Sequence, residues 1–192
     1  MQVLETARLR LRPFREGDAR ALFLLLSDPA VNAFLPMFPL QSEEEAQALL
    51  QRWGLDAHHA ALCPRYAVCQ KEEDVPVGYV QVGGGESRDL GYALRRELWD
   101  RGLVPEACRA VLEQLRRAGV PYVTATHDVN NPRSGQVLKK LGMRYCYSYE
   151  EQWQPKNFPV IFRMYQLDLD GAQGRVFRGY WEQAAVHFVE NL

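Results

Sequence analysis

The stretch DLGYALRRELWDRGLVPEACRAVLEQLRRAG, residues 89–119, places a short strand, a charged turn and a helix in direct succession. The strand is expected over Asp89–Leu94, and the helix begins at Leu103. A strand that feeds through a tight turn into a helix leaves backbone N–H groups free at the helix start, and such groups bind phosphate. Gly102 lets a ligand approach this backbone closely, although an ordinary strand–helix turn accounts for the same residues.

The helix after this turn has the clearest pattern in the chain. Its apolar residues recur at every fourth position, as on the buried face of an amphipathic helix: Leu103, Ala107, Val111 and Leu115. Pro105 lies in the first turn, where proline is tolerated, and Gly119 is placed to end the helix. Glu113 and Arg117 are spaced to pair on its exposed side. The pattern predicts a helix over residues 103–118.

A second strand, Tyr122–Thr126, and a second short helix follow. The helix begins after Asn131 and ends near Met143. Asn131 is a favourable N-cap because its side chain can accept a hydrogen bond from the first turn, and Pro132 suits the first helical position.

The rest of the chain predicts a mixed α/β domain. Alternation over Ala7–Phe14 predicts a half-buried strand, and Asp18 is placed to cap a helix that follows. Ser42–Glu45 fits the start of a second helix that runs to about Ala57. Further strands are predicted over residues 66–70, 76–82, 144–150 and 160–169, and a tail helix over 175–191. The order β-α-α-β-β-β-α-β-α-β-β-α predicts helices covering a central sheet.

Composition excludes several classes of protein. The chain has 192 residues, 47% hydrophobic and 24% charged, which is typical of one soluble globular domain. Its net charge of −1 gives no general attraction to nucleic acid or to anionic membranes. No apolar run approaches the roughly 20 residues that span a bilayer, and the N-terminus lacks an apolar signal region. We therefore expect a cytoplasmic protein with no nucleic-acid or membrane partner.

The sequence predicts no metal site. The four cysteines are scattered and form no C-x-x-C pair, so reduced thiols are expected. His58 and His59 are adjacent at a polar helix end and need no metal ion to explain them.

Several motifs, in order and with the right spacing, resemble the GCN5-related N-acetyltransferase superfamily, and most of all its branch of ribosomal-protein N-terminal acetyltransferases. They are WDRGLVPEA (residues 99–107), NPRS (131–134) and KLGM (140–143), together with LETARLRLR (4–12) and SDP (27–29). The resemblance extends over roughly residues 3–169. It implies a mostly antiparallel central sheet with a V-shaped split, flanked by helices.

The resemblance further implies acetyl-CoA as cosubstrate, bound in the split between the strands at 89–94 and 122–126. Its pyrophosphate would lie on the turn at 99–104, and the pantetheine arm would pair with the strand backbone like an added strand. The residues expected to contact it are Tyr92, Ala93, Leu94, Arg101, Gly102, Leu103, Val104, Asn131 and Ser134.

The chain departs from the superfamily pattern at two places. Asp100 stands where the first loop glycine is usual, and Glu97 aligns with a usual Gln or Arg. Both carboxylates would repel a pyrophosphate unless they point away or pair with nearby arginines. Leu138 replaces the tyrosine that many members use as a general acid, so the resemblance to the branch implies the Ser134 hydroxyl in that role.

A base must take a proton from the ammonium form of the acceptor. Glu151 is our first candidate because some members of the branch carry a carboxylate on this strand, where Glu150 is its neighbour. His127 is a second candidate, and a structural role accounts for either residue equally well. Phe34 and Phe38 line either an acceptor pocket or a packed loop.

The sequence thus predicts an acetyl-CoA-dependent N-acetyltransferase that acts on a primary amine, either a protein N-terminus or a small amine. The alternative is a non-catalytic acyl-CoA-binding or interaction protein with the same fold. We expect the acetyltransferase domain over residues 1–170 and a helical extension over 171–192. The apolar stripe of the extension must be buried on the same chain or on a partner, which leaves a homodimer open.

Overall fold

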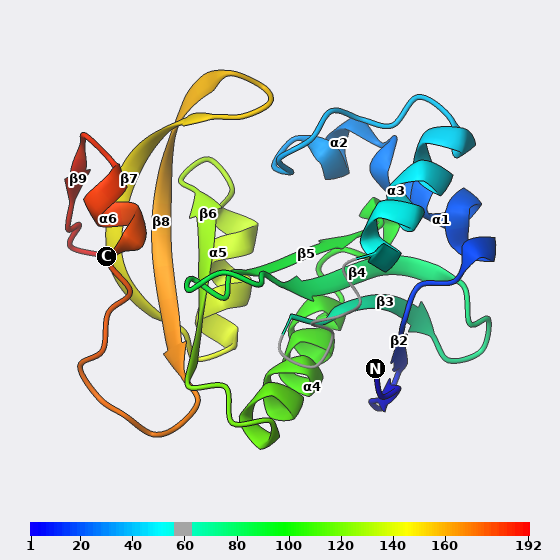
Figure 1. The fold of residues 1–192 in the computed structure, drawn as a ribbon, viewed down its shortest axis with the longest axis horizontal. Coiled ribbons are helices and arrows are strands. Elements are labelled where there is room, and N and C mark those ends of the chain that lie inside the picture. Colours follow the sequence, from blue (N-terminus) through cyan, green and yellow to red (C-terminus); the bar gives the residue numbers. More distant parts are fainter. Residues whose placement is uncertain (56–62) are drawn as a thin grey trace.

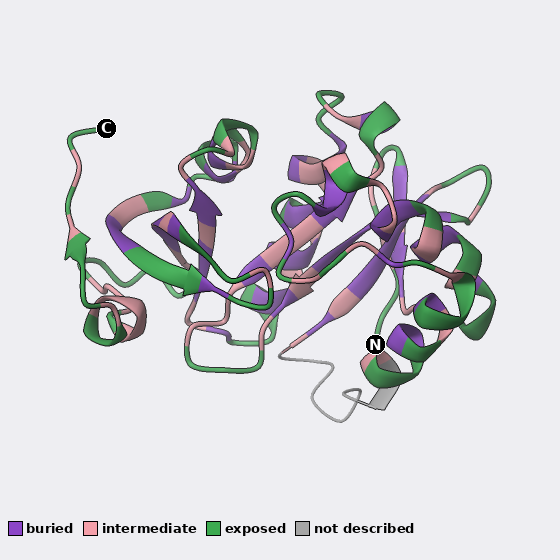
Figure 2. Ribbon diagram, turned by 90° about the horizontal axis from the view of Figure 1, so that it is seen from above, coloured by how far each residue is buried: buried purple, intermediate pink, exposed green. Residues whose placement is uncertain are grey.

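The protein, analysed as a computed structural model, is described over residues 1–55 and 63–192. The predicted end of the second helix near Ala57 and the His58–His59 pair lie outside the described residues. Two antiparallel sheets stand side by side, with helices packed on their faces (Figure 1). Buried residues follow the strands of both sheets, and exposed residues follow the outer helix surfaces (Figure 2).

The first sheet has the strand order β1-β2-β3-β4-β5. Its strands are β1 (Leu4–Glu5), β2 (Leu9–Arg12), β3 (Arg65–Gln70), β4 (Pro76–Val82) and β5 (Leu90–Leu94). All neighbours in this sheet pair antiparallel. The glycine-rich residues 83–85 lie in the connection from β4 to β5, and the two strands pair as an antiparallel hairpin.

The second sheet has the order β6-β8-β7-β9. Its strands are β6 (Tyr122–Asp128), β7 (Arg144–Trp153), β8 (Phe158–Asp168) and β9 (His187–Phe188). A parallel bridge between Asp89, just before β5, and Thr124 of β6 joins the two sheets. From this bridge β5 and β6 run in different directions (Figure 1), so the predicted V-shaped split is confirmed.

Helices cover the first sheet on both faces. The helices α1 (Ala19–Leu26), α2 (Pro29–Asn32) and α3 (Glu43–Leu55) build a core that includes Tyr79 and Ala93. The helix α4 (Leu103–Arg117) packs on the opposite face against a second core, and α5 (Pro132–Lys140) lies beside α4 and β6 in the same core. Alternate residues of β5 therefore face different helix layers, because side chains alternate along a strand.

The tail corrects one prediction. A helix over 175–191 is wrong: the C-terminal helix α6 spans only Gly179–Gln183, and β9 follows it on the edge of the second sheet. The chain itself buries most of the predicted apolar stripe, since Val176, Phe177, Tyr180 and Trp181 pack on β7 and β8. The periodicity suggested further helical turns after α6. Instead, His187 and Phe188 pair with the edge of β7 as a strand.

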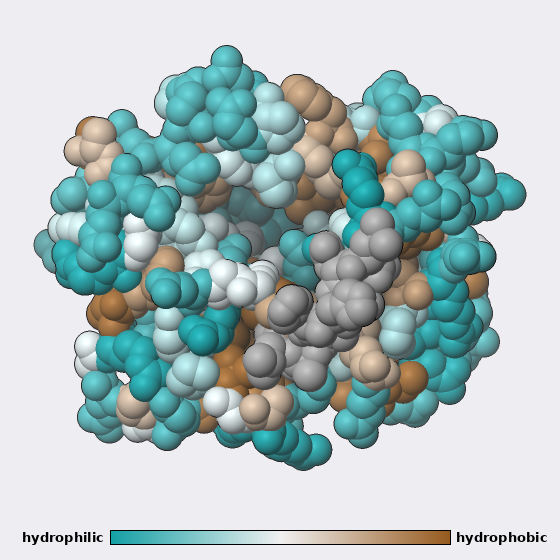
Figure 3. Space-filling model, in the orientation of Figure 1, coloured by the Kyte–Doolittle hydropathy of each residue, from teal (hydrophilic) through white to brown (hydrophobic). Residues whose placement is uncertain are grey.

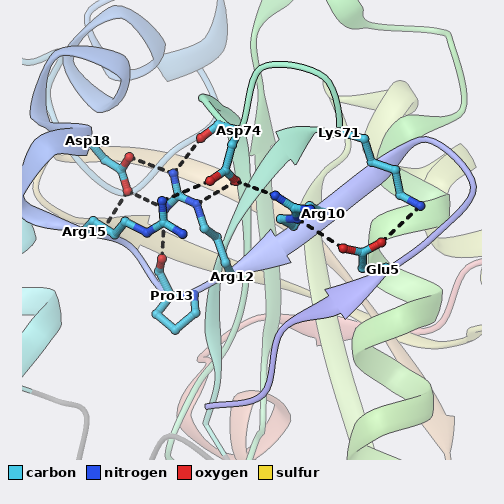
Figure 4. A network of polar contacts seen from close by, with 8 residues as sticks. All are labelled: Glu5, Arg10, Arg12, Pro13, Arg15, Asp18, Lys71 and Asp74. Carbon is cyan, nitrogen blue, oxygen red and sulfur yellow. Dashed lines mark hydrogen bonds and ion pairs between the residues drawn. The ribbon is translucent and has the colours of Figure 1, made fainter.

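Asp18 corrects a second prediction, because its side chain does not cap α1. It accepts two hydrogen bonds, at 2.7 and 2.9 Å, from the guanidinium of Arg12, which is only 2% exposed (Figure 4). Arg12 also donates to Asp74 in the turn between β3 and β4. The buried arginine therefore ties β2, the start of α1 and this turn together.

Candidate active site

The turn before α4 offers free backbone N–H groups. Gly102 precedes α4 in the left-handed conformation, at φ 73°, which glycine adopts without strain. Among the residues that the structure describes, no side chain caps the first turn of α4. The N–H groups of Leu103 and Val104 therefore lie at an uncapped helix start, where the helix dipole also attracts an anion.

Both acidic residues at this turn are paired with arginines. Glu97 lies 2.8 Å from Arg95, and Asp100 lies 3.5 Å from Arg133. These exposed ion pairs offset part of the repulsion expected between the two carboxylates and a pyrophosphate at this turn.

Arg101 is exposed, and its carbonyl accepts a 2.9 Å hydrogen bond from Arg8. Arg8 is a residue that sequence reasoning missed: its guanidinium lies 3.6 Å from where a Gly102 side chain would begin, and it is anchored by Glu106 at 2.6 Å. Arg8 and Arg101 thus add positive charge to the turn.

The edge of β5 that faces β6 has free backbone groups. Asp89 and Arg95 bond their backbones to Gly83 and Val77 on the β4 side. Because bonded residues alternate along an antiparallel strand, Ala93 also faces β4, whereas Leu90, Tyr92 and Leu94 face the split. The Leu94 carbonyl already accepts from the Trp99 indole at 2.7 Å. Of the three expected contacts, Ala93 therefore offers no backbone group to the split.

Tyr92 and Ser134 meet across the split. Their hydroxyl oxygens are 2.8 Å apart, and the Tyr92 hydroxyl also lies 3.2 Å from the Ser134 carbonyl. Burial raises the pKa of Tyr92 and keeps it protonated. Asn131 caps α5 as predicted, accepting a 3.3 Å hydrogen bond from the Ser134 N–H. The cap fixes Ser134 in the first turn of α5, facing β5.

A carboxyl group stands at the vertex of the split. Asp89 accepts a 3.3 Å hydrogen bond from the Thr124 hydroxyl at the bridge between the sheets. Burial raises the pKa of Asp89 to about 7, despite hydrogen bonds from Thr124 and Tyr180 that oppose the shift. Sequence patterns did not indicate Asp89, because an acidic residue at a strand start has no distinctive pattern.

Glu151 shares a face of the second sheet with Tyr149, and burial raises its pKa as well. Its charge also contributes to raising the pKa of Asp89, so the two carboxyl groups belong to one electrostatic environment. Glu150 and Glu151 are both exposed, but Glu150 points to the other face, and its backbone N–H is bonded to Val186. The second sheet therefore presents Glu151, rather than Glu150, on the Tyr149 face.

His127 points to the opposite face, toward α5. It is 4% exposed, its Nδ1 lies 2.8 Å from the Asp128 carbonyl, and a Cβ added at Gly135 would lie 2.8 Å from its Nε2. Burial lowers its pKa. Leu138 is fully buried in the core and contributes no chemistry at the split. Neither residue is placed to meet an acceptor on the Asp89 face.

A hollow between the first sheet with its helices and the second sheet with its helices is visible near the centre of the space-filling view (Figure 3). The connection from β7 to β8 leans toward α2 (Figure 1), and Lys156 in it donates to the carbonyls of Asn32 and Ala33 at 2.6 and 3.1 Å. Phe34 and Phe38 follow α2 with 39% and 61% of their surface exposed. Phe38 is thus not packed into the core.

The described residues contain no cluster of three or more His, Cys, Asp or Glu that could hold a metal ion. In the same residues, no helix is both long enough and apolar enough to cross a membrane.

The comparisons with known proteins agree with this geometry. Residues 8–144, more than half of the chain, match the acetyltransferase (GNAT) domain family. The chain is 24% identical over 156 residues to the uncharacterized N-acetyltransferase YoaA of Bacillus subtilis, covering 74% of this chain and 82% of that one. It is 27% identical over 150 residues to the uncharacterized N-acetyltransferase p20 of Bacillus licheniformis, covering 75% and 83%.

Solved structures share the fold. RimL, a ribosomal L7/L12 alpha-N-protein acetyltransferase in complex with coenzyme A, superposes with a TM-score of 0.77 at 19% identity. The match covers 89% of this chain and all of RimL. The split sheet, the uncapped turn before α4 and the match over residues 8–144 lead to one conclusion: this chain belongs to the GNAT family of acetyltransferases, which use acetyl-CoA.

Proposed function

We propose that this acetyltransferase moves the acetyl group of acetyl-CoA to a primary amine, with the reaction taking place at the vertex of the split. The observation that carries the proposal is that the free β5 edge joins two sites. The uncapped turn at Gly102 lies beyond one end of the edge, and the Asp89 carboxyl lies at the other. A cosubstrate with an anionic end and a reactive end fits this arrangement.

The residues at the turn suit the anionic end. The N–H groups of Gly102, Leu103 and Val104 are proposed to bind the pyrophosphate, with Arg101 and Arg8 supplying charge. The backbones of Tyr92 and Leu94 are proposed to hold the pantetheine arm through the groups that face the split. Asn131 then acts through the cap that positions Ser134.

Acetyl-CoA supplies an activated acyl group. The amine nitrogen of the acceptor forms the new C–N bond, the C–S bond breaks, and the leaving thiolate takes a proton. Holding amine and acyl group together accounts for much of the rate. The acceptor must first lose the proton of its ammonium form.

We propose that Asp89 accepts this proton. Its carboxyl faces the vertex, and a pKa of about 7 suits a base that works near neutral pH. Glu151, which the sequence made our first candidate for the base, is proposed instead to attract the cationic amine to the same face. The Ser134 hydroxyl, held 2.8 Å from that of Tyr92, is proposed to give a proton to the thiolate and to take up the proton that the acylated nitrogen loses as the amide forms.

The acceptor is a protein N-terminus or a small amine. The name of RimL describes an enzyme for the N-terminus of a ribosomal protein, which supports the first class. The Asp89 and Glu151 carboxyl groups favour a cationic acceptor of either class. We also propose that the protein is cytoplasmic, which cell fractionation would test. A homodimer stays a prediction, which light scattering would test.

The test is thiol release from acetyl-CoA with a panel of small amines and N-terminal peptides. Amine-dependent release at neutral pH is the expected result. Isothermal titration with acetyl-CoA distinguishes the alternative function. Binding without turnover on the whole panel would support a non-catalytic acyl-CoA-binding protein. No binding at millimolar concentration would exclude both the transferase and the acyl-CoA-binding protein.

A further inference from the structure

We propose that the C-terminal segment, residues 175–190, forms a wall of the acceptor site and that Tyr180 limits the size of the acceptor beside its amine. This inference rests on the proposed function. It makes residues 171–192 part of the active site, where the sequence suggested only an extension packed on the domain.

The segment is held firmly on the second sheet. The Tyr147 hydroxyl donates to the Phe177 carbonyl at 2.8 Å, and the Tyr147 ring packs edge-on against Trp181 with centroids 5.3 Å apart. The Phe177 N–H donates to Gln166 at 2.8 Å. Farther along, His187 and Phe188 pair with the edge of β7, and Glu190 reaches Arg163 on the opposite face of the sheet at 2.5 Å. Residues 176–181 therefore follow a fixed path across one face of β7 and β8.

This path lies on the face where the acceptor must arrive. Thr124 pairs with Gln166 and Met164 with Tyr147, so these side chains point to one side of the second sheet, the side covered by α6. Asp89 meets the Thr124 hydroxyl on that side. The helices α4 and α5, with the uncapped turn, lie on the other side. Acetyl-CoA and the acceptor would thus approach Asp89 from opposite faces.

Tyr180 reaches this point from the segment. Its ring stacks on Tyr149 with centroids 5.2 Å apart and an interplanar angle of 6°. Its hydroxyl lies among Ser87, Thr124 and Asp89, where it acts as a hydrogen-bonding partner. The aromatic pair therefore borders the carboxyl group that we propose as the base.

Tyr180 also borders open space. Together with Ser87, Tyr122 and residues 175–179, 182 and 183 it lines a groove of about 640 Å³ between the C-terminal segment and the turn before β5. Because Tyr180 contacts both the groove and Asp89, removing its ring would extend the groove to the carboxyl group. The phenol ring is the feature that keeps the space beside Asp89 small.

The experiment compares two acceptors that differ in bulk next to the amine, glycinamide and phenylalaninamide, by thiol release from acetyl-CoA. For the wild type we expect glycinamide to be preferred in kcat/KM. Tyr180→Ala is expected to raise the phenylalaninamide-to-glycinamide ratio by at least about tenfold, since loss of a few carbons of pocket wall changes discrimination by that order. The KM for acetyl-CoA should stay unchanged.

Three variants sharpen the test. Tyr180→Phe keeps the ring and should keep the wild-type ratio. Tyr147→Phe removes a hydroxyl that anchors the segment away from Asp89 and is the matched control, also without effect on the ratio. Tyr180→Val repeats the size test with a different small residue if Tyr180→Ala does not fold.

An unchanged ratio in a folded, active Tyr180→Ala or Tyr180→Val protein overturns the inference and leaves the proposed function standing. A wild type that binds acetyl-CoA but acetylates neither these amides nor any amine of the panel overturns both. An equal rise of the ratio in Tyr147→Phe would assign the effect to loosening of the segment and would also overturn the role of the Tyr180 ring.

Discussion

Replacing Asp89 with Asn tests the chemistry at the vertex. The change keeps the size of the side chain and removes the group that ionises. With a pKa of about 7, roughly a tenth of the carboxyl groups are ionised at pH 6 and nine tenths at pH 8. We therefore expect wild-type kcat/KM to rise about tenfold over this interval, and Asp89→Asn to lose about 10²- to 10⁴-fold at pH 8 together with the pH step.

The same substitution should stabilise the fold at high pH. Burial raises the pKa of Asp89 above its unfolded value of about 3.8, so the folded state keeps a proton that the unfolded state loses. Ionisation therefore costs stability progressively as the pH rises from about 4 to about 7. The upper bound at pH 8 is about 4 kcal/mol, and partial exposure of the residue makes the real value smaller.

Two assays decide the matter: initial rates of thiol release between pH 6 and pH 9, and thermal unfolding at pH 5 and pH 8. Asp89→Asn should melt higher than the wild type at pH 8, with the gap shrinking at pH 5. Glu151→Gln is the matched control. It is expected to change the KM for the amine and to leave the rise of kcat/KM between pH 6 and pH 8 largely in place. A wild-type step that survives in Asp89→Asn and disappears in Glu151→Gln would refute the reasoning and make Glu151 the base.

Three further substitutions have defined outcomes. Gly102→Val should cost about 1–2 kcal/mol of stability because of the positive φ, and should abolish acetyl-CoA binding by titration; retained affinity would contradict the turn as the anion site. Arg12→Ala should cost about 3–5 kcal/mol in urea unfolding by leaving the Asp18 carboxylate buried without its ion-pair partner, whereas Arg10→Ala, at a half-exposed position, should cost less than about 1 kcal/mol. Gly135→Val should cost about 1–3 kcal/mol, since its Cβ would lie 2.8 Å from His127, and equal melting temperatures would argue against that contact.

Local patterns predicted most elements because they depend on neighbours in the chain. The helix over 103–118 and the strand over 76–82 occur as α4 and β4 almost to the residue, since one apolar face or one buried strand gives each an unambiguous period. The tail failed for the same reason. Its apolar spacing fits a helix, but β7 offers an open edge to His187–Phe188, and that partner is not visible in the tail's own sequence.

The site shows the same division. Gly102, Asn131 and Ser134 could be placed from the sequence because a helix start demands particular residues. Asp89, Arg8 and Tyr180 could not, because each acquires its setting from a segment far away in the chain: Thr124, Glu106 and Tyr149. An acidic residue at a strand start is ordinary until another sheet buries it.

The sequence by itself pointed to the family through a resemblance of ordered motifs, and it predicted most strands and helices before the tail from short-range spacing. Only the tertiary structure decided which backbone groups of β5 are free, which carboxyl group lies at the vertex, and which face of the second sheet the C-terminal segment covers. The physical reason is that burial and strand pairing are set by distant residues, and these two factors control both a pKa and access to a site.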